Sequence, residues 1–339
     1  MTAVTVAIPV RDGGELLART LAALARQTVE HELLVCDSGS LDGSAELAQA
    51  HGARVLRIDP AQFGHGATRN LLMREASGAR VALLTQDAEP ADERWLERLL
   101  GGLDLAPDVA IACGPYTPRP HASEPVRMEL ERWFSSLAGD GAPYAERLSE
   151  HERETLPVLS LVGRRGFFTD ANACLSRAAW ERVPFREVAY AEDRVLAIDM
   201  LRAGYAKAYV PAAAVLHSHA YTTAEQLRRC FDEWRGLREV YGWREPASPG
   251  RLLGQLRGDL GQARRELARA HLPAAARASA LAAVSRHNVV RQVGALLGSR
   301  ADLLPGRARR ALSLERRAGF APLHLDPSAD RPRAEEHAQ

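Results

Sequence analysis

Cysteine is scarce in this sequence and never closely spaced. The four cysteines, Cys36, Cys113, Cys174 and Cys230, are far apart and form no Cys-x-x-Cys pair. Cys36 and Cys174 also lie in apolar stretches with the character of strands, which predicts buried, reduced thiols. Reduced thiols are typical of the cytoplasm, so we expect a cytoplasmic protein.

Long apolar runs are absent as well. No stretch approaches the roughly 18–20 apolar residues that are needed to cross a bilayer. The opening MTAVTVAIPV lacks the basic region and the long apolar stretch of a signal peptide, and predicts a first strand instead. We therefore expect any membrane contact to be peripheral, at the inner face of the cell membrane.

A large net charge of either sign is also lacking. The formal net charge is +1, which predicts no general attraction to nucleic acid. The charge is unevenly distributed, because fifteen arginines and five acidic residues lie between Arg244 and Arg317. With 46% hydrophobic and 26% charged residues, the composition is that of an ordinary globular protein. The length fits one large domain with an appendage, or two modest domains.

The first third of the chain alternates strand-like and helix-like segments. This alternation predicts an α/β fold with a mostly parallel central sheet that helices cover on both faces. Ligands bind such sheets at the carboxyl ends of the strands. We expect strands at 4–9, 32–36, 54–58, 80–84 and 109–113, and helices at 13–26, 43–51, 67–76 and 92–102.

The rest of the chain is less regular. Six prolines interrupt residues 115–157, where we expect one helix at 127–137. Strands at 170–175, 208–210 and 214–216 and helices at 192–203 and 223–241 follow, and then a basic helical stretch at 251–318. We expect a main domain at 1–243 (halves 1–115 and 116–243), a helical extension at 244–320 and a disordered tail at 321–339.

The loop after the second expected strand carries three polar side chains. In VCDSGSLDGS, Asp37, Ser38 and Asp42 follow an apolar run. A carboxylate at the end of a strand can accept hydrogen bonds from a pyrimidine ring or a ribose, and the small residues let the backbone approach that ligand. An Asx turn or a helix N-cap at Ser40 or Asp42 explains the same pattern without a ligand, so both interpretations stay open.

Asp87 follows the fourth expected strand, in LTQDAEP. A divalent cation that bridges two phosphates needs a hard oxygen ligand at this place, and Mg²⁺ or Mn²⁺ takes only one or two carboxylates in such sites. Capping of the helix at 92–102 is the alternative.

Glu192 and Asp193 begin the helix at 192–203, in a loop with apolar flanks. Carboxylates are stabilised at a helix N-terminus by the helix dipole, which is a purely structural explanation. The functional alternative is that one of them removes the proton of an acceptor hydroxyl group.

His217 and His219 alternate on a short expected strand and therefore point the same way. Two imidazoles at the end of a strand can bind a metal ion or donate hydrogen bonds to phosphates. A structural role for each histidine is the alternative.

Together these motifs resemble glycosyltransferase family 2, and within it the bacterial rhamnosyltransferases, from Val4 to about Tyr241. Two positions depart from the commoner family pattern: Thr85 replaces the first Asp of a DxD motif, and Arg11-Asp12 replaces an aromatic residue and Asn. The matching segments are Ile8-Pro9, the loop Asp37–Ser44, Phe-x-His-Gly-x-Thr-Arg-Asn at Phe63–Asn70, Leu-Thr-Gln-Asp-Ala at Leu84–Ala88, Pro184-Phe185 before Glu192-Asp193, and His-Ser-His-x-Tyr at His217–Tyr221.

The resemblance implies a GT-A fold and a role for each matching residue. Asp193 is then the general base, supported by Glu192. Mg²⁺ or Mn²⁺ is bound by Asp87 with His217 or His219. Asp37 holds the nucleotide base, and Arg69 contacts the nucleotide or its phosphates. The whole set implied for the nucleotide sugar is Pro9, Asp12, Asp37, Ser38, Asp42, His65, Arg69, Gln86 and Asp87.

The implied activity is an inverting, metal-dependent sugar transfer to a hydroxyl group of a glycan or lipid-linked glycan, in cell-surface polysaccharide synthesis. The motifs favour L-rhamnose from dTDP-rhamnose, with a UDP- or GDP-sugar as the alternative. A sugar nucleotidyltransferase would need a glycine-rich basic loop, where Val10–Glu15 has a single arginine. The absence of GxGxxG disfavours a dehydrogenase. The residues Asp87, Asp193 and His217 disfavour a non-catalytic nucleotide-binding module.

The basic stretch 251–318 has three interpretations. It can be a packed helical subdomain, a homodimer element, or a pair of helices on an anionic lipid surface. Amphipathicity alone does not separate them. The resemblance favours the membrane interpretation somewhat, because related enzymes use lipid-linked acceptors.

Overall fold

The computed structural model describes residues 3–269, 273–323 and 325. The described residues form two compact units. The first contains residues 3–119, 132–218 and 325, and the second contains residues 120–131, 219–269 and 273–323.

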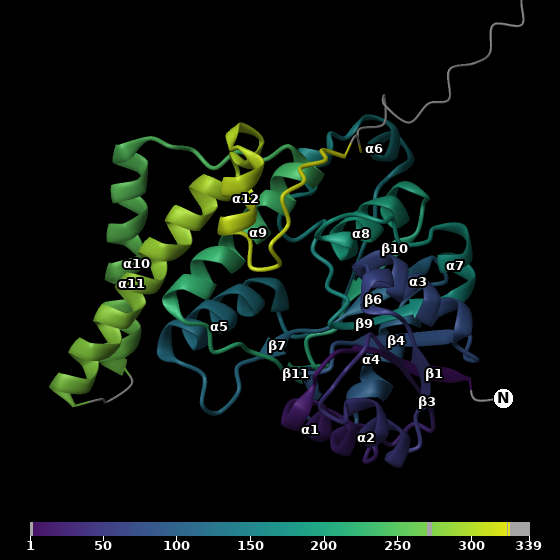
Figure 1. Cartoon of the computed structure of the whole chain (residues 1–339). Coiled ribbons are helices and arrows are strands. Elements are labelled where there is room, and N and C mark those ends of the chain that lie inside the picture. The colour runs from purple at the N-terminus through teal and green to yellow at the C-terminus, as the bar shows by residue number, and fades with distance from the viewer. Residues whose placement is uncertain (1–2, 270–272, 324, 326–339) are drawn as a thin grey trace, which may run out of the picture. The chain divides into compact units, whose positions relative to one another are not determined.

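An eight-stranded sheet forms the centre of the first unit (Figure 1). In spatial order its strands are β3 (Arg54–Arg57), β2 (Glu32–Asp37), β1 (Val4–Val10), β4 (Arg80–Leu84), β9 (Asn172–Ser176), β6 (Val109–Cys113), β10 (Ala206–Tyr209) and β8 (Tyr144–Glu146). The neighbours from β3 to β4 pair in parallel, as do β6 and β10. β9 is antiparallel to β4 and β6, and β8 is antiparallel to β10. The expected α/β fold with a mostly parallel sheet is confirmed.

Helices flank this sheet. α3 packs against β1 and β2, α4 against β6 and β9, and α8 against β6 and β10. The long helix α5 (Glu124–Ala138) is divided between the two units. The other helices are α1 (Gly14–Leu24), α2 (Ser44–Ala50), α3 (His65–Glu75), α4 (Trp95–Leu103), α6 (Glu150–Thr155), α7 (Arg177–Arg182) and α8 (Glu192–Arg202), with 3₁₀ turns at Pro60–Gln62 and Val158–Leu161.

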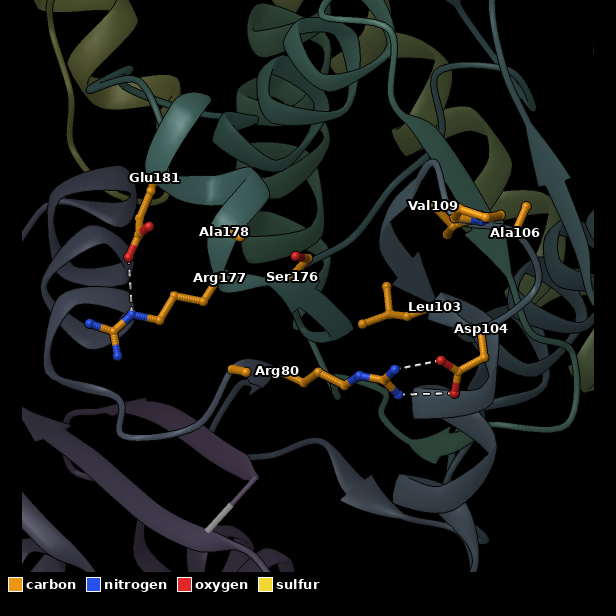
Figure 2. A pocket seen from close by; sticks show the side chains of 11 residues that line it. Arg80, Leu103, Asp104, Ala106, Val109, Ser176, Arg177, Ala178 and Glu181 are labelled. Atoms are coloured by element: carbon orange, nitrogen blue, oxygen red, sulfur yellow. Dashed lines mark hydrogen bonds and ion pairs between the residues drawn. The ribbon is translucent and has the colours of Figure 1, made fainter. Parts of the chain in front are cut away.

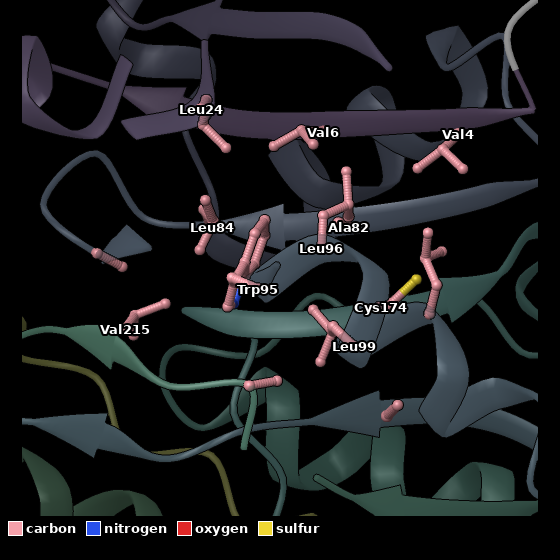
Figure 3. Packing of buried hydrophobic residues seen from close by; sticks show 14 of the residues in the cluster. Val4, Val6, Leu24, Ala82, Leu84, Trp95, Leu96, Leu99, Cys174 and Val215 are labelled. Atoms are coloured by element: carbon pink, nitrogen blue, oxygen red, sulfur yellow. The ribbon is translucent and has the colours of Figure 1, made fainter. Parts of the chain in front are cut away.

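One apolar cluster fixes α1 and α4 on the sheet (Figure 3). Leu24 of α1, Trp95 of α4 and Val6 of β1 are all essentially inaccessible to solvent. The Trp95 indole nitrogen also donates a hydrogen bond of 2.9 Å to the Asn172 amide oxygen at the beginning of β9. Burial of side chains this large contributes roughly 1.5–3 kcal/mol each, so the cluster holds both helices on the sheet.

A second, three-stranded sheet joins segments that are far apart in the sequence. Its strands, in spatial order, are β5 (Glu89–Pro90), β11 (Val215–Leu216) and β7 (Tyr116–Thr117). β5 begins two residues after Asp87, and β11 ends one residue before His217. This small sheet therefore brings those two residues together.

One expectation drawn from composition can be compared directly with the structure. All four cysteines are buried and unbonded, as the sequence predicts. Among the described residues, no helix combines the length and the apolar character that a membrane crossing requires.

The second unit is a packed group of helices: α9 (Thr223–Tyr241), α10 (Pro249–Arg269), α11 (Ala274–Gly298) and α12 (Gly306–Leu312), with a 3₁₀ turn at Ala301–Leu303. α11 lies very close to α9, because a Cβ on Gly298 would come within 2.4 Å of the Phe231 carbonyl oxygen. α10 runs beside α11 (Figure 1). Of the tail expected at 321–339, only 321–323 and 325 are among the described residues.

Candidate active site

The candidate residues gather at the edge of the sheet where the parallel strands end. The loops after β1, β2, β4 and β6 all leave the sheet at this edge. β9 runs the other way, so its first residue, Asn172, pairs with Leu84 at the end of β4. Asp170, two residues before Asn172, therefore also lies at this edge.

Hydrogen bonds tie the loop after β1 to the loop after β2. The Asp12 backbone N–H donates to the Ser40 hydroxyl at 2.9 Å, and the Leu41 N–H donates to the Asp12 carboxylate at 2.8 Å. The Gly14 N–H donates to the Asp42 carboxylate at 2.9 Å. Asp12 has a left-handed backbone with a φ of 47°, a conformation that Asp tolerates better than most residues. Asp12 and Asp42 thus shape the paired loops.

Asp37 is the buried carboxylate of these loops. It ends β2 and is 4% exposed, and it accepts the backbone N–H groups of Gly39 at 3.2 Å and Ser40 at 3.3 Å. Ser38 is also buried, and its hydroxyl donates to the Val10 carbonyl oxygen at 3.1 Å. Pro9, in β1, pairs with Cys36 beside them.

Gln86 connects the loop after β4 to the same region. Its side-chain oxygen accepts the Arg11 backbone N–H at 2.8 Å, and its side-chain nitrogen donates to the Arg11 carbonyl oxygen at 3.0 Å. The structure therefore brings Gln86 to the loops that carry Asp12 and Asp37.

Asp87 and His217 face each other across the small sheet. The His217 Nδ1 lies 3.5 Å from the Asp87 Oδ1. Arg119 fixes the Asp87 loop by donating to the Asp87 carbonyl oxygen at 2.7 Å and pairing with Glu89 at 3.1 Å. The ring of Tyr116 packs edge-on against His217, with ring centroids 4.7 Å apart. The imidazole and the carboxylate are therefore held side by side.

These residues fit a divalent cation. One ligand atom from each of Asp87, His217 and His219 lies within 4.8 Å of the other two. Opposite ligands of an ion with bonds of about 2.1 Å lie about 4.2 Å apart, so small side-chain movements would complete such a site. Imidazole nitrogen is a poor ligand for Mg²⁺, which prefers oxygen, and a better ligand for transition metals. The donor set is one carboxylate with two imidazoles, which could hold a divalent cation.

A buried ionic cluster lies at the same edge. The Arg69 guanidinium, 4% exposed, donates to the Asp170 carboxylate at 2.9 Å through Nη2 and also contacts it through Nε. Its Nη1 lies 3.1 Å from the Glu192 carboxylate and donates to the His65 carbonyl oxygen at 3.1 Å. Two buried carboxylates from distant parts of the chain thus share one guanidinium.

The other residues of the Phe63–Asn70 motif fasten the segment that leads into α8. The Asn70 amide donates to the Phe185 carbonyl oxygen at 2.8 Å and accepts the Phe185 N–H at 3.0 Å. Gly66 lies directly against this segment, since a Cβ there would be 2.3 Å from the Arg186 carbonyl oxygen. The motif therefore holds the chain just before Glu192 in place.

Asp193 is the second residue of α8. The helix is preceded by Ala191, which has a left-handed backbone with a φ of 62° that costs roughly 1–2 kcal/mol for a residue with a Cβ. Strain of this kind persists where the surroundings impose it, often at functional sites. Burial raises the pKa of Asp193 to about 6, and the nearby Asp170 carboxylate adds to the rise. A carboxylate with that pKa can accept a proton at neutral pH.

Tyr116 connects the Asp87–His217 pair to the ionic cluster of Arg69, Asp170 and Glu192. Its hydroxyl is hydrogen-bonded to the Thr169 hydroxyl, one residue before Asp170, while its ring packs on His217. Burial raises the pKa of Tyr116, and the carboxylates of Asp193 and Asp170 add to that rise. The carboxylate cluster and the Asp87–His217 pair thus belong to one site.

The sequence did not point to Asp170, Tyr116 or Arg119. Asp170 stands in FFTDANA, an apolar segment that was expected to begin a strand. A charged residue inside such a segment is the one signal that could have identified it, because unpaired charges are rarely buried.

A groove of about 660 Å³ lies elsewhere on the first unit (Figure 2). It is lined by residues at the beginnings of β4 and β6 and the end of β9, which is the opposite edge of the sheet. Its two arginines, Arg80 and Arg177, are already paired with Asp104 and Glu181 (Figure 2). We therefore do not place the chemistry in this groove.

Comparison with known sequences agrees with the geometry. Residues 5–153 match the family model described as Glycosyl transferase family 2. The O-antigen chain rhamnosyltransferase RfbN of Salmonella typhimurium is 31% identical over 234 residues, which cover 68% of this chain and 70% of that protein. The O-antigen chain rhamnosyltransferase WbaN of Salmonella anatum is 30% identical over 214 residues, which cover 62% of this chain and 64% of that protein.

A solved structure shares the fold. The mannosyltransferase PcManGT from Pyrobaculum calidifontis, in complex with GDP-Man and Mn²⁺, superposes with a TM-score of 0.55. The superposition covers 89% of this chain and 86% of that protein, with 19% sequence identity. At this level of identity the likeness concerns the fold alone.

Proposed function

The chain belongs to glycosyltransferase family 2, and we propose that it performs an inverting, metal-dependent transfer of a sugar from a nucleotide to an acceptor hydroxyl group. The observation that supports this most strongly is the arrangement at one edge of the sheet. There the loops with Asp37 and Asp87 follow parallel strands that end at the same edge, and His217 lies beside Asp87. The Asp193 carboxylate is in the first turn of α8, which the Arg69–Glu192 ion pair ties to this edge.

In this proposal Asp193 acts as the general base. Its carboxylate accepts the proton of the acceptor hydroxyl group while the hydroxyl oxygen forms a bond to the anomeric carbon. The bond from that carbon to the diphosphate breaks on the opposite face, and the electron pair leaves with the nucleoside diphosphate. A single displacement inverts the anomeric configuration. A retaining double displacement needs a second carboxylate as nucleophile. The two buried carboxylates of this region, Asp170 and Glu192, are both bound to the Arg69 guanidinium.

Asp87, His217 and His219, two residues after His217, are the residues we propose for binding Mn²⁺ or Mg²⁺. A bound divalent cation would offset the negative charge that develops on the departing diphosphate. Asp37 would accept hydrogen bonds from the nucleoside, and the loops shaped by Asp12, Ser38 and Asp42 would line the pocket.

We propose L-rhamnose, carried as dTDP-rhamnose, as the donor sugar. Support comes from two relatives named as rhamnosyltransferases at about 30% identity. The test is a donor competition. The purified protein is given dTDP-rhamnose, a UDP-sugar and a GDP-sugar separately with Mn²⁺, and the kcat/KM for nucleoside diphosphate release is compared. A higher kcat/KM with a UDP- or GDP-sugar would reject rhamnose as the donor sugar, while the assignment as a glycosyltransferase would stand.

The acceptor sugar is proposed to bind near Trp133, which is 37% exposed. Its ring packs edge-on against Phe167 at 5.4 Å, and Phe167 carries the Arg194 guanidinium at 4.6 Å from its ring centroid. Arg194 directly follows Asp193. Trp133 is thus linked through Phe167 to the residue beside the base, and its exposed ring suits the C–H face of a sugar ring.

Replacing Trp133 by Ala should therefore raise the acceptor KM roughly two- to tenfold, because an aromatic contact is worth roughly 0.5–1.5 kcal/mol. The donor KM should stay unchanged, and Trp133→Phe should have a smaller effect. Leu159→Ala, at another exposed apolar residue of the same unit, is the matched control. Steady-state kinetics with each substrate varied would check this, and equal effects of Trp133→Ala on both KM values would contradict it.

The basic helices are proposed to hold the enzyme to the inner, anionic face of the membrane, where a lipid-linked acceptor would be. Arg251, Arg257 and Arg264 of α10 are exposed. Each arginine near such a surface contributes roughly 1 kcal/mol, and salt screens that attraction. The full chain should therefore co-sediment with anionic vesicles at low salt, and changing these three arginines to Glu should weaken binding by roughly a hundredfold or more.

The matched control changes Arg26, Arg74 and Arg182, which are exposed on the first unit, to Glu. It should leave sedimentation nearly unchanged. If both triple variants lost vesicle binding equally, or if binding did not depend on lipid charge, the membrane role would be rejected. The helices would then have a packing or homodimer role.

A further inference from the structure

The ionic cluster of Arg69, Asp170 and Glu192 is more elaborate than stability requires. Asp170 and Glu192 are 5% and 6% exposed, and Arg69 is 4% exposed. Desolvation of such ions is expensive, and a buried ion pair often stabilises a fold no better than apolar residues of similar volume. Two carboxylates on one guanidinium also leave an excess negative charge, and burial raises the pKa of Asp170 well above its ordinary value. The cluster therefore suggests a role other than stability.

Its geometry connects three separate elements to the beginning of α8. Arg69 comes from α3, Asp170 from the loop before β9, and Glu192 is the first residue of α8. The guanidinium contacts Asp170 through Nε and Nη2, and it contacts Glu192 through Nη1. Because two of its nitrogens are held by Asp170, that carboxylate determines the orientation in which the guanidinium meets Glu192 at the beginning of α8. Such fork-like contacts restrict orientation as well as distance. The strained Ala191 lies at the junction that they hold.

We propose that Asp170 is a positioning residue for Asp193: through Arg69 it fixes the first turn of α8 and so the place of the base. The inference rests on the proposed function, since it assigns Asp193 as the base. It also gives Arg69 a different role from a direct contact to the nucleotide, because all three guanidinium nitrogens contact protein groups.

Asp170 should also affect the proton affinity of the base. The groups that interact electrostatically with Asp193 are Asp170 before β9, Arg69 on α3, Arg194 on α8, Tyr116 on β7 and Cys113 on β6. Glu192, the preceding residue on α8, lies near His65 of α3. While Asp170 is ionised, its charge opposes ionisation of Asp193, whereas the Arg69 charge favours it. The close contact with the Arg69 guanidinium favours this ionised form of Asp170 and opposes the effect of burial. Removing the Asp170 charge ends its repulsion of the Asp193 carboxylate. It also leaves the positive charge of Arg69 less neutralised, and both effects lower the pKa of Asp193.

The first test compares Asp170→Asn with the parent enzyme. We expect kcat to fall at least tenfold with an unchanged donor KM, and the acidic limb of the kcat/KM profile to move to lower pH. Asp170→Glu, which restores the carboxylate, should recover part of kcat and return the limb toward its parent position. Asp199→Asn is the matched control, since it removes another ion pair of α8, with Arg186 at 2.7 Å. If the acidic limb of the kcat/KM profile did not move in Asp170→Asn, or moved equally in Asp199→Asn, the inference would be overturned.

A second variant covers the case in which Asp170→Asn does not fold. Arg69→Lys keeps the charge and loses the fork geometry. A positioning role predicts a lower kcat with an unchanged donor KM. A direct contact to the nucleotide predicts weaker donor binding instead, and that result would overturn the inference.

A measurement without turnover separates this inference from the proposed function. The pKa of Asp193 can be followed by NMR of ¹³C-labelled aspartate carboxyl groups, with the signal assigned from Asp193→Asn. A lower Asp193 pKa in Asp170→Asn than in the parent supports the coupling even if no donor is found, and an unchanged pKa overturns it. Failure of the proposed function would appear elsewhere, as a parent enzyme that releases no nucleoside diphosphate from any donor.

Discussion

Replacing Asp193 by Asn should lower kcat by roughly 10²–10⁴ while donor binding stays nearly unchanged, because the amide keeps the shape of the side chain and removes its basicity. The parent enzyme should show the pH dependence of a base that must be deprotonated. Since burial raises the pKa of Asp193 to about 6, kcat/KM should rise with pH through about 6 and then level off. In Asp193→Asn this acidic limb should disappear from the remaining activity.

Glu192→Gln is the comparison that tests the assignment within the pair. Glu192 is bound to the Arg69 guanidinium at 3.1 Å, so its loss should disturb the first turn of α8 and lower kcat without abolishing the acidic limb. If Asp193→Asn turned over normally and Glu192→Gln did not, the two roles would be reversed. Thermal unfolding of both variants would show whether either loss reflects a damaged fold.

Replacing Asp87 by Ala should abolish both metal binding and turnover. Asp87 is the one carboxylate of the proposed metal site, and Thr85 stands where a second one would be expected. His217→Ala and His219→Ala should have milder effects, and His217 should matter more, because its Nδ1 already lies 3.5 Å from the Asp87 carboxylate. Isothermal titration with Mn²⁺ and assays after EDTA treatment would measure both properties.

Glu89→Gln is the matched control for Asp87→Ala. Glu89 lies two residues away and pairs with Arg119, so its loss disturbs the same loop without removing a proposed ligand. It should retain Mn²⁺ binding. Full activity of the parent enzyme in excess EDTA would falsify the metal assignment, and restoration of Asp87→Ala by higher Mn²⁺ concentrations would show that Asp87 is not essential for binding.

Much of the fold could be predicted from sequence because the strands are buried on both faces and the helices are amphipathic. Val4–Val10 and Arg80–Leu84 stand out as apolar runs that are followed by helical periodicity. The direction of Asn172–Ser176 could not be predicted in the same way. Pairing is decided by distant partners, and an apolar run of five residues carries no sign of its orientation. As a parallel strand, β9 would have carried Asp170 to the edge opposite the site.

The sequence predicted most of the individual loops of the candidate site, but not the contacts that join them. The loops with Asp37, Asp87 and Asp193 were expected because they follow or begin recognisable elements. The small sheet was missed, because β5 and β7 are only two residues long, too short to show a period. Arg69 illustrates the same limit: the motif identified the residue, while its bonds to Asp170 and Glu192 depend on segments about a hundred residues away or more.

The central claim is that a nucleotide sugar is cleaved in a metal-dependent transfer with inversion. The most direct measurement incubates the purified enzyme with dTDP-rhamnose and a glycan acceptor, with Mn²⁺ or with EDTA, and follows both nucleoside diphosphate and product by NMR. We predict release that needs Mn²⁺, that rises with acceptor concentration, and that yields an α-rhamnoside from the β-linked donor. Release that is equal in EDTA, or a product with retained β configuration, would contradict the mechanism proposed for Asp87 and Asp193.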